Sequence, residues 1–318
     1  MAASSPKPSL LLLLMVLASC KPTSKEQTTG TNSSPKTEQA MPDSTSQALK
    51  HLPADTQTLV SLDLKKLRSQ EEWPSLMNAL LGPASSASLA RFESLCGFSF
   101  AENIESIRYA SRKNGHHIID VSGLTRSLLD GCLAKMPQRK LSADGAISRL
   151  QNGDQTNVFL WLGENRFLFS NAPAPEDELV AISEQSEVSL PVTFLKLLKE
   201  VDTTSDAWVA IRGSHEVLDK LSATKQKARA ALFLELRLGE VSKFNGAIAT
   251  SSNEDAKTAY GALENVLADL RSRDDGVEKL ADLITLTQHG NNVRFMGDLD
   301  RANLGLAIKA LLPSQVNE

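Results

Sequence analysis

Cys20 is the residue whose neighbours most directly indicate a chemistry. It follows the tripeptide Leu17-Ala18-Ser19 at the end of an apolar run over residues 10–18, with Lys7 upstream. Small side chains leave the backbone accessible to a peptidase cleft, and a cysteine thiol is a nucleophile that can take up a transferred group. A membrane-spanning helix needs about 20 apolar residues, so this shorter run predicts a secretory signal.

Leu17-Ala18-Ser19-Cys20 resembles the lipobox of bacterial lipoproteins. The resemblance implies that residues 1–19 are a signal peptide, which is removed after Cys20 accepts a diacylglyceryl group. One acyl chain binds a membrane reversibly, whereas two or more anchor a protein stably. Lys21 stands where an Asp would retain a Gram-negative lipoprotein, so the resemblance implies a periplasm-facing outer-membrane protein of the cell envelope, or one at the cell surface.

Residues 20–48 contain the acylated cysteine and a tether. Eleven of residues 21–47 are Ser or Thr, and the only apolar ones are Ala40 and Met41. Such a segment cannot bury enough apolar surface to offset its ordering entropy, so we expect it to be disordered.

Cys96 and Cys132 remain once Cys20 is acylated. In an oxidising periplasm an even remainder favours pairing, so we expect a disulfide, with two buried free thiols as the alternative. A catalytic thiol is not expected, because no histidine lies near either cysteine in sequence.

The histidines and acidic pairs give no clear catalytic or metal site. Successive residues of a strand point to opposite faces, so His116 and His117 could not share one metal ion. His51, His215 and His289 are isolated, and Asp300 is best read as a helix N-cap. Nucleotide-binding glycine loops, H-E-x-x-H, G-x-S-x-G and C-x-x-C are all missing from the sequence. We therefore expect no catalytic residue, metal or cofactor, although a convergent hydrolase-type site stays an alternative.

The composition excludes some classes of partner. The 34 basic and 38 acidic side chains give a net charge of −4, without the clustered basic face that nucleic acid requires. Aromatic residues make up 5 % of the chain, so an aromatic platform for sugars or bases is not expected.

The elements that must carry these residues begin near Leu49. Alternating apolar residues predict a strand over 59–64, with Val60, Leu62 and Leu64 on one face. Further strands are predicted at 104–110, 116–121, 147–151, 158–162 and 166–170, and helices at 65–81, 88–96 and 124–136. The segment 171–191 contains prolines and is read as a separator between two halves.

The second half follows a similar pattern. Strands are predicted at 208–212, 242–250, 283–288 and 293–299, and helices at 214–238, 251–270 and 302–312. Ser251 and Glu254 form a capping box for the helix over 251–270. Asn114-Gly115 and Gly290-Asn291 are turn pairs typical of hairpins.

Four stretches resemble the layout of uncharacterised exported bacterial proteins: "LPADTQTLVSLDLKKLRSQEEWPSL", "LCGFSFAENIESIRYA", "SSNEDAKTAYGALENVLADL" and "VRFMGDLDRANLGLAIKALL". The resemblance implies an α+β fold and carries no functional residue. We expect antiparallel or mixed sheets with packed helices in two possibly similar halves, 49–185 and 186–318.

These features predict a membrane-tethered lipoprotein without catalytic activity that binds or scaffolds an unknown protein in the envelope. The alternative is a carrier of a lipid or another apolar ligand, since amphipathic helices against a sheet can enclose a cavity.

Overall fold

The structure is a computed structural model that describes part of the chain. The described residues are 49–71, 73–112, 115–136, 139–152, 155–170, 172, 174–185, 187–212, 231–272 and 278–304. The predicted signal peptide, Cys20, the predicted tether, Asn114, His215 and most of the predicted helix 302–312 lie outside these ranges.

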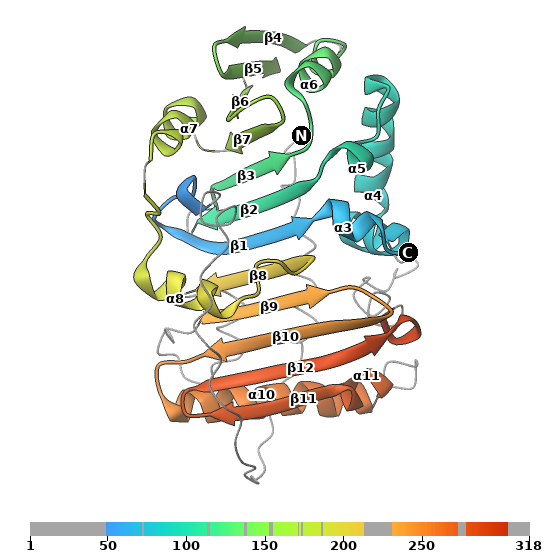
Figure 1. The fold of residues 1–318 in the computed structure, drawn as a ribbon, viewed down its shortest axis with the longest axis vertical. Helices are drawn as coiled ribbons and strands as arrows, with labels where there is room; N and C mark the ends of the chain where they lie inside the picture. Colours follow the sequence, from blue (N-terminus) through green and yellow to red (C-terminus); the bar gives the residue numbers. More distant parts are fainter. Residues whose placement is uncertain are drawn as a thin grey trace. The chain divides into compact units, whose positions relative to one another are not determined.

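The described residues divide into two compact units. The larger unit holds residues 49–69 and 87–211, and the smaller unit holds 70–86 and 212–304, apart from the gaps given above. The predicted boundary at 185/186 falls inside the larger unit. Both units combine helices with antiparallel strands, which confirms the predicted α+β class (Figure 1).

The larger unit contains an antiparallel sheet with strand order β8-β1-β2-β3-β7-β6-β5-β4. The strands are β1 (Thr56–Asp63), β2 (Ser106–Arg112), β3 (His117–Ser122), β4 (Arg139–Asp144), β5 (Ile147–Asn152), β6 (Gln155–Trp161), β7 (Arg166–Ser170) and β8 (Ala207–Arg212). Its helices are α3 (Leu64–Arg68), α5 (Phe100–Asn103), α6 (Arg126–Leu133), α7 (Pro175–Ser183) and α8 (Val192–Glu200). Helix α4 (Trp73–Cys96) has its later residues in this unit and its earlier residues in the smaller one.

One face of this sheet packs on α7 to form a core. Ile118, Val158, Leu160 and Leu168 from the strands meet Leu179 and Ile182 from the helix. Helix α7 begins at Pro175, whose missing N–H costs nothing in the first turn. The proline-containing segment 171–191 was expected to separate two halves of the chain. That expectation was wrong, because Pro175 begins α7, which packs into the core of the larger unit.

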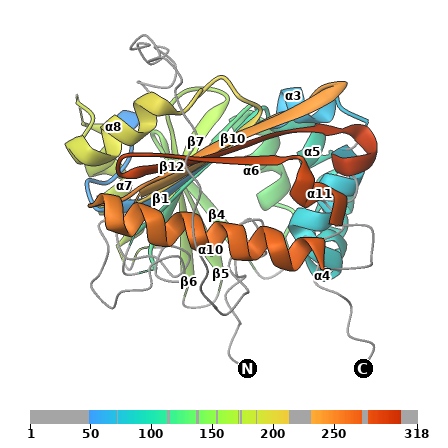
Figure 2. The ribbon, with the colours of Figure 1, turned by 90° about the horizontal axis from the view of Figure 1, so that it is seen from below.

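The smaller unit contains the strand order β11-β12-β10-β9. Its strands are β9 (Ala231–Arg237), β10 (Val241–Ala249), β11 (Ile284–His289) and β12 (Asn292–Asp300), and its further helices are α10 (Asn253–Arg271) and α11 (Glu278–Asp282). Figure 2 shows α10 along one face of β10 and β12. Val266, Leu267 and Leu270 of α10 pack with Ile284 and Leu286 of β11.

Several local predictions were wrong. Residues 231–237, predicted to end a helix, form β9, because pairing with β10 overrides the helix preference of Leu, Glu and Arg. The cap of α10 is Ser252, whose Oγ accepts from the Asp255 N–H at 3.0 Å, instead of the predicted Ser251 and Glu254. Strand β1 ends at Asp63, so Leu64, predicted to share a strand face with Val60 and Leu62, instead begins α3.

Candidate functional site

Six rings form a continuous row on the sheet face of the larger unit opposite α7. We call Tyr109, His117, Phe169, Phe159, Phe167 and Trp161 the aromatic row. Successive ring centroids along it, in that order, lie 5.2, 6.5, 5.5, 5.7 and 5.1 Å apart. These spacings are largely those of tilted and edge-to-face aromatic contacts.

The row follows from strand alternation and register. In β6 and β7 the aliphatic residues Val158, Leu160 and Leu168 point toward α7, so Phe159 and Phe169 point to the other face. Antiparallel pairing then sets Tyr109 opposite Ile119, Ile119 opposite Phe169, and Phe169 opposite Phe159. Directly opposed residues share a face of the sheet.

The row is buried at one end and partly open at the other. Phe167 and Trp161 are 6 % and 5 % exposed, whereas Tyr109, His117, Phe159 and Phe169 are only half-buried. Trp161 Nε1 donates to Ser148 Oγ at 3.1 Å, and Ser148 Oγ donates to Asp130 of α6 at 3.2 Å. The buried end is therefore fixed in position beside α6.

Burial favours the neutral form of both ionisable members of the row. Burial lowers the pKa of His117 below its ordinary value of 6.5, and burial raises the pKa of Tyr109 above its ordinary value of 10.0. The half-buried end is consequently an uncharged surface that combines rings with Ile119.

The opposite face holds a buried ionic cluster with a structural role. Asp120 is 2 % exposed and accepts two hydrogen bonds from Arg166, at 2.9 and 2.8 Å, while Arg108 lies at 3.5 Å. The cost of burying a carboxylate is offset when it is paired with a cation and hydrogen-bonded in this way. His51 lies close by, with Nδ1 3.4 Å from the Ile182 carbonyl oxygen, and burial lowers its pKa.

Ion pairs hold α7 on the same face. Arg112 pairs with Glu178, Ser170 Oγ donates to Glu178, and Arg149 binds Glu176 through two nitrogens. The Arg149 guanidinium lowers the pKa of the Glu176 carboxyl. Each charged group here already faces a protein partner, so the cluster positions a helix.

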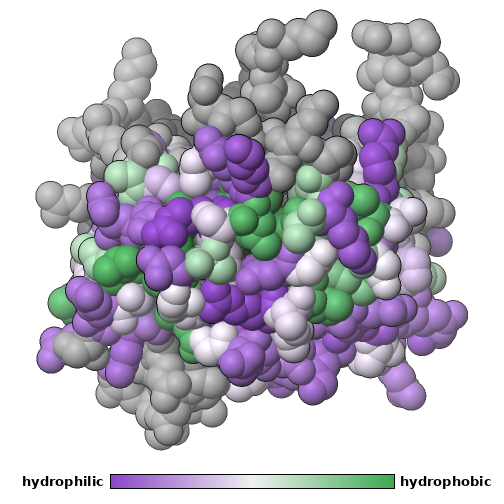
Figure 3. All heavy atoms as spheres, turned by 90° about the horizontal axis from the view of Figure 1, so that it is seen from above, coloured by the Kyte–Doolittle hydropathy of each residue, from purple (hydrophilic) through white to green (hydrophobic). Residues whose placement is uncertain are grey.

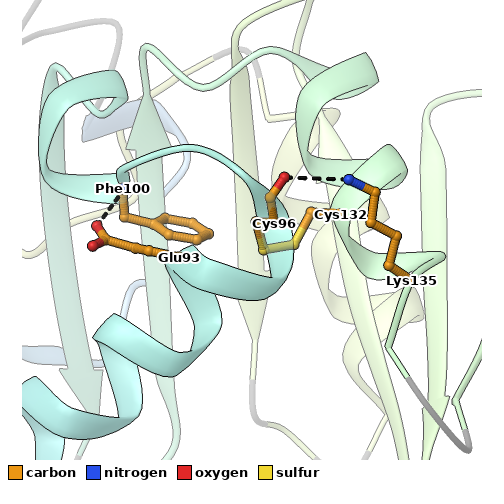
Figure 4. The surroundings of a disulfide bond; sticks show 5 residues. All are labelled: Glu93, Cys96, Phe100, Cys132 and Lys135. Atoms are coloured by element: carbon orange, nitrogen blue, oxygen red, sulfur yellow. Dashed lines mark hydrogen bonds between the residues drawn. A yellow bond between two sulfur atoms is a disulfide. The ribbon is translucent and has the colours of Figure 1, made fainter.

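Cys96 and Cys132 are joined by a disulfide with a Cα–Cα distance of 4.6 Å (Figure 4). Cys96 is the last residue of α4, and Cys132 lies in α6. Next to the bond, Glu93 accepts the Phe100 backbone N–H at 2.7 Å, and Lys135 Nζ donates to the Cys96 carbonyl at 3.4 Å. The bond therefore links the last residue of α4, which lies in the larger unit, to α6.

The histidines that the structure describes are not brought together into one site. His117 begins β3 and His116 precedes it, while His289 lies exposed at the end of β11. Within the described ranges, no group of three or more His, Cys, Asp or Glu side chains is placed to hold a metal ion. Asp300 Oδ1 accepts the Asn303 N–H at 2.8 Å, in the manner of an N-cap.

Among the described helices, none combines the length and the apolar character that crossing a membrane requires. In Figure 3, hydrophobic side chains form small separate patches between hydrophilic ones on the face seen from above.

The aromatic row was missed at the level of sequence. The low aromatic content argued against a platform, yet the fold gathers one of two tyrosines, one of three tryptophans and three of ten phenylalanines. The available signal was the spacing by two of Phe159 with Trp161 and of Phe167 with Phe169. Only strand pairing connects these to Tyr109 and His117.

Comparison with known proteins gives a likeness of fold. No family model matches the chain, and no curated protein matches it. Crystal form III of TP0453 matches with a TM-score of 0.52 and 9 % identity, over 82 % of this chain and 97 % of that one. Crystal form IV matches with a TM-score of 0.50 and 10 % identity, over 82 % of this chain and 95 % of that one. Crystal form I matches with a TM-score of 0.50 and 8 % identity, over 83 % of this chain and 97 % of that one. At these identities the likeness shows the α+β architecture alone.

Proposed function

We propose that the protein is a lipid-anchored binding or scaffolding module of the bacterial cell envelope, without catalytic activity, and that it contacts its partner through the aromatic row. The lipobox Leu17-Ala18-Ser19-Cys20 supports the anchor. The observation that carries the binding role is the half-buried, uncharged end of the row, formed by Tyr109, His117, Phe159 and Phe169.

Aromatic surfaces suit this role for a physical reason. Rings supply a large apolar area and have few rotatable bonds, so burying them against a partner costs little side-chain entropy. Neighbouring rings already restrain each other here, with Phe159 and Phe169 centroids 5.5 Å apart. Interfaces are enriched in such residues and depleted of charge at their centres.

Photocrosslinking in the intact envelope tests the proposal. A photoreactive side chain at Ile119, between Tyr109 and Phe169, should form reproducible adducts with one partner. The same probe at Lys257, an exposed position of α10, serves as the control. Adducts at Ile119 should disappear when Tyr109→Ala and Phe169→Ala are combined in a folded variant. Identical adducts at both positions, or none at Ile119, would contradict the proposal.

A second candidate function is the carriage of a lipid or another apolar ligand. Thr58 lies on the sheet face that carries the aromatic row. It pairs with Ser111 of β2, and Ser111 pairs with His117 of β3. Thr58 is 6 % exposed, and within the described part of the chain its Oγ1 has no hydrogen-bond partner. A buried hydroxyl without a partner is costly, so a polar group of a ligand bound along the row would be stabilised there.

Native mass spectrometry of the gently extracted full chain distinguishes the two functions. A carrier should retain a bound lipid mass, and Thr58→Val should reduce its occupancy. A wild-type protein that carries no additional mass would exclude the carrier function.

A further inference from the structure

Among the described strands of the smaller unit, β11 lies at the edge, last in the order β11-β12-β10-β9 (Figure 1). Within the described part of the chain, its backbone ladder partner is β12. Exposed edges usually carry charged residues or proline, which discourage pairing with other strands. The sequence of β11, Ile-Thr-Leu-Thr-Gln-His, has neither, whereas the edge strand β4 carries exposed Lys140 and Asp144.

The hairpin register determines which backbone groups face outward. His289 pairs with Asn292 around the two-residue turn at Gly290 and Asn291. The pair that closes such a turn exchanges hydrogen bonds, and bonding alternates along an antiparallel ladder. Thr285, Thr287 and His289 therefore bond to β12. The N–H and C=O groups of Ile284, Leu286 and Gln288 point away from it.

We propose that β11 pairs with β11 of a second copy of this chain, antiparallel and about a two-fold axis at Leu286. This register sets Leu286 opposite Leu286, Ile284 opposite Gln288, and Thr285 opposite Thr287. In the Leu286–Leu286 pair and in the two Ile284–Gln288 pairs, each residue donates its N–H to the facing residue and accepts that residue's N–H with its C=O. These bonds use the outward backbone groups of Ile284, Leu286 and Gln288.

The side chains of β11 are complementary to themselves in this register. Leu286 and Ile284 pack with α10, so a Leu286 pair extends an apolar layer that already exists. Thr285 and Thr287 lie on the other face, where threonine pairs across strands are favourable. No charged residue of β11 meets a like charge, as an isologous interface requires.

The pairing is expected to be reversible. A single strand pair buries less than the roughly 800 Å² per partner of a standard stable interface, so the dimer should form in a concentration-dependent manner. The inference uses residues of β11, β12 and α10 only, and it is independent of the aromatic row and of the lipid anchor.

Charge exchange on β11 tests both the pairing and its register. Sedimentation velocity of the full chain in density-matched detergent should show a shift from monomer to dimer as concentration rises. Thr285→Lys with Thr287→Lys should weaken association about tenfold or more, because lysines then face each other twice. Thr285→Lys with Thr287→Glu should restore it, because the introduced lysine of one copy then faces the introduced glutamate of the other.

A second pair of variants separates edge pairing from misfolding. Gln288→Pro removes one outward N–H and leaves the bonds to β12 in place, so it should weaken the dimer while the circular dichroism spectrum is unchanged. Gln288→Ala retains that N–H and should associate like wild type. A wild-type chain that is monomeric at every concentration overturns the proposal. So does a double-lysine variant that pairs as tightly as wild type, or a lysine/glutamate variant no tighter than the double-lysine one.

Discussion

Two glycines of the smaller unit lie opposite phenylalanine rings. In the pairing of β10 with β12, Gly246 is opposite Phe295 and Gly297 is opposite Phe244. A Cβ built on either glycine would overlap the facing ring and a neighbouring backbone carbonyl oxygen, that of Phe233 or of Leu283. The two rings thus fill the space left by the missing side chains of Gly246 and Gly297. They also cover the backbone at these positions, where glycine has no side chain that could pack.

Gly246→Ala is expected to lower the free energy of unfolding by about 1–3 kcal/mol, the usual cost of overpacking. Equilibrium urea unfolding measures this. Gly261→Ala is the matched control, because Gly261 lies in α10 with open space where its Cβ would be. That change should stabilise the protein by about 0.5–1 kcal/mol through helix propensity. Destabilisation of equal size by both changes would show that the ring contact is not the cause.

Two half-buried histidines make stability depend on pH. Burial lowers the folded-state pKa of His51 and of His117 below the ordinary value of 6.5, so the unfolded chain binds protons more readily. The free energy of unfolding should therefore be highest above pH 6.5 and should fall as the pH drops through 6.5 toward the folded pKa values. Urea unfolding at several pH values checks this direction.

His51→Gln combined with His117→Gln should flatten that pH dependence. His289→Gln, at an exposed position, is the control and should retain the wild-type slope. A double variant with an unchanged slope would assign the dependence to other groups.

At the scale of elements, the disulfide fixes the end of α4 against α6. It closes a loop with a sequence separation of 36 residues, and both cysteines are buried, with Cys96 6 % and Cys132 1 % exposed. Cross-linking restricts the unfolded chain, by about 4 kcal/mol for a loop of this length in the chain-entropy model.

Cys96→Ala with Cys132→Ala should therefore lower the free energy of unfolding by about 2–4 kcal/mol in urea titration. Adding a reductant to the wild type should produce a similar loss. The reductant should leave the double variant unchanged, and a double variant as stable as the oxidised wild type would contradict the role given to the bond.

At the scale of the whole molecule, the two described units differ in construction. Strands β1–β8 belong to the larger unit and β9–β12 to the smaller one, so the described strands do not repeat one order in two halves. The larger unit carries the aromatic row and the disulfide, whereas the smaller one carries the open β11 edge. The proposed binding surface and the proposed self-pairing edge thus belong to different units.

The proposed lipid anchor gives a prediction for the whole chain. Cys20→Ala removes the thiol that we propose accepts the diacylglyceryl group, so the protein should be lost from the washed membrane fraction. Cell fractionation measures this, and mass spectrometry of the N-terminal peptide should find the acyl groups in wild type only. Full membrane retention of the variant would show that another feature holds the protein.

The sequence by itself predicted the elements that are defined by local patterns. The α10 helix, with its apolar residues at helical spacing, and the β11–β12 hairpin around Gly290-Asn291 were predicted closely. Strand β7 was predicted with its observed bounds. Apolar spacing and turn-forming residues act over a few positions, so they can be recognised without knowledge of the fold. The lipobox is equally local, and it remains a prediction.

Only the tertiary structure decided the features that join distant residues. Residues 231–237 form β9 because β10 lies beside them, although their composition favours a helix. The aromatic row requires that β2, β3, β7 and β6 pair in that order and in one register. A shift of one residue in any pairing would turn a strand's rings to the other face. Register depends on contacts between segments far apart in the chain, so the surface proposed to bind a partner becomes visible only after folding.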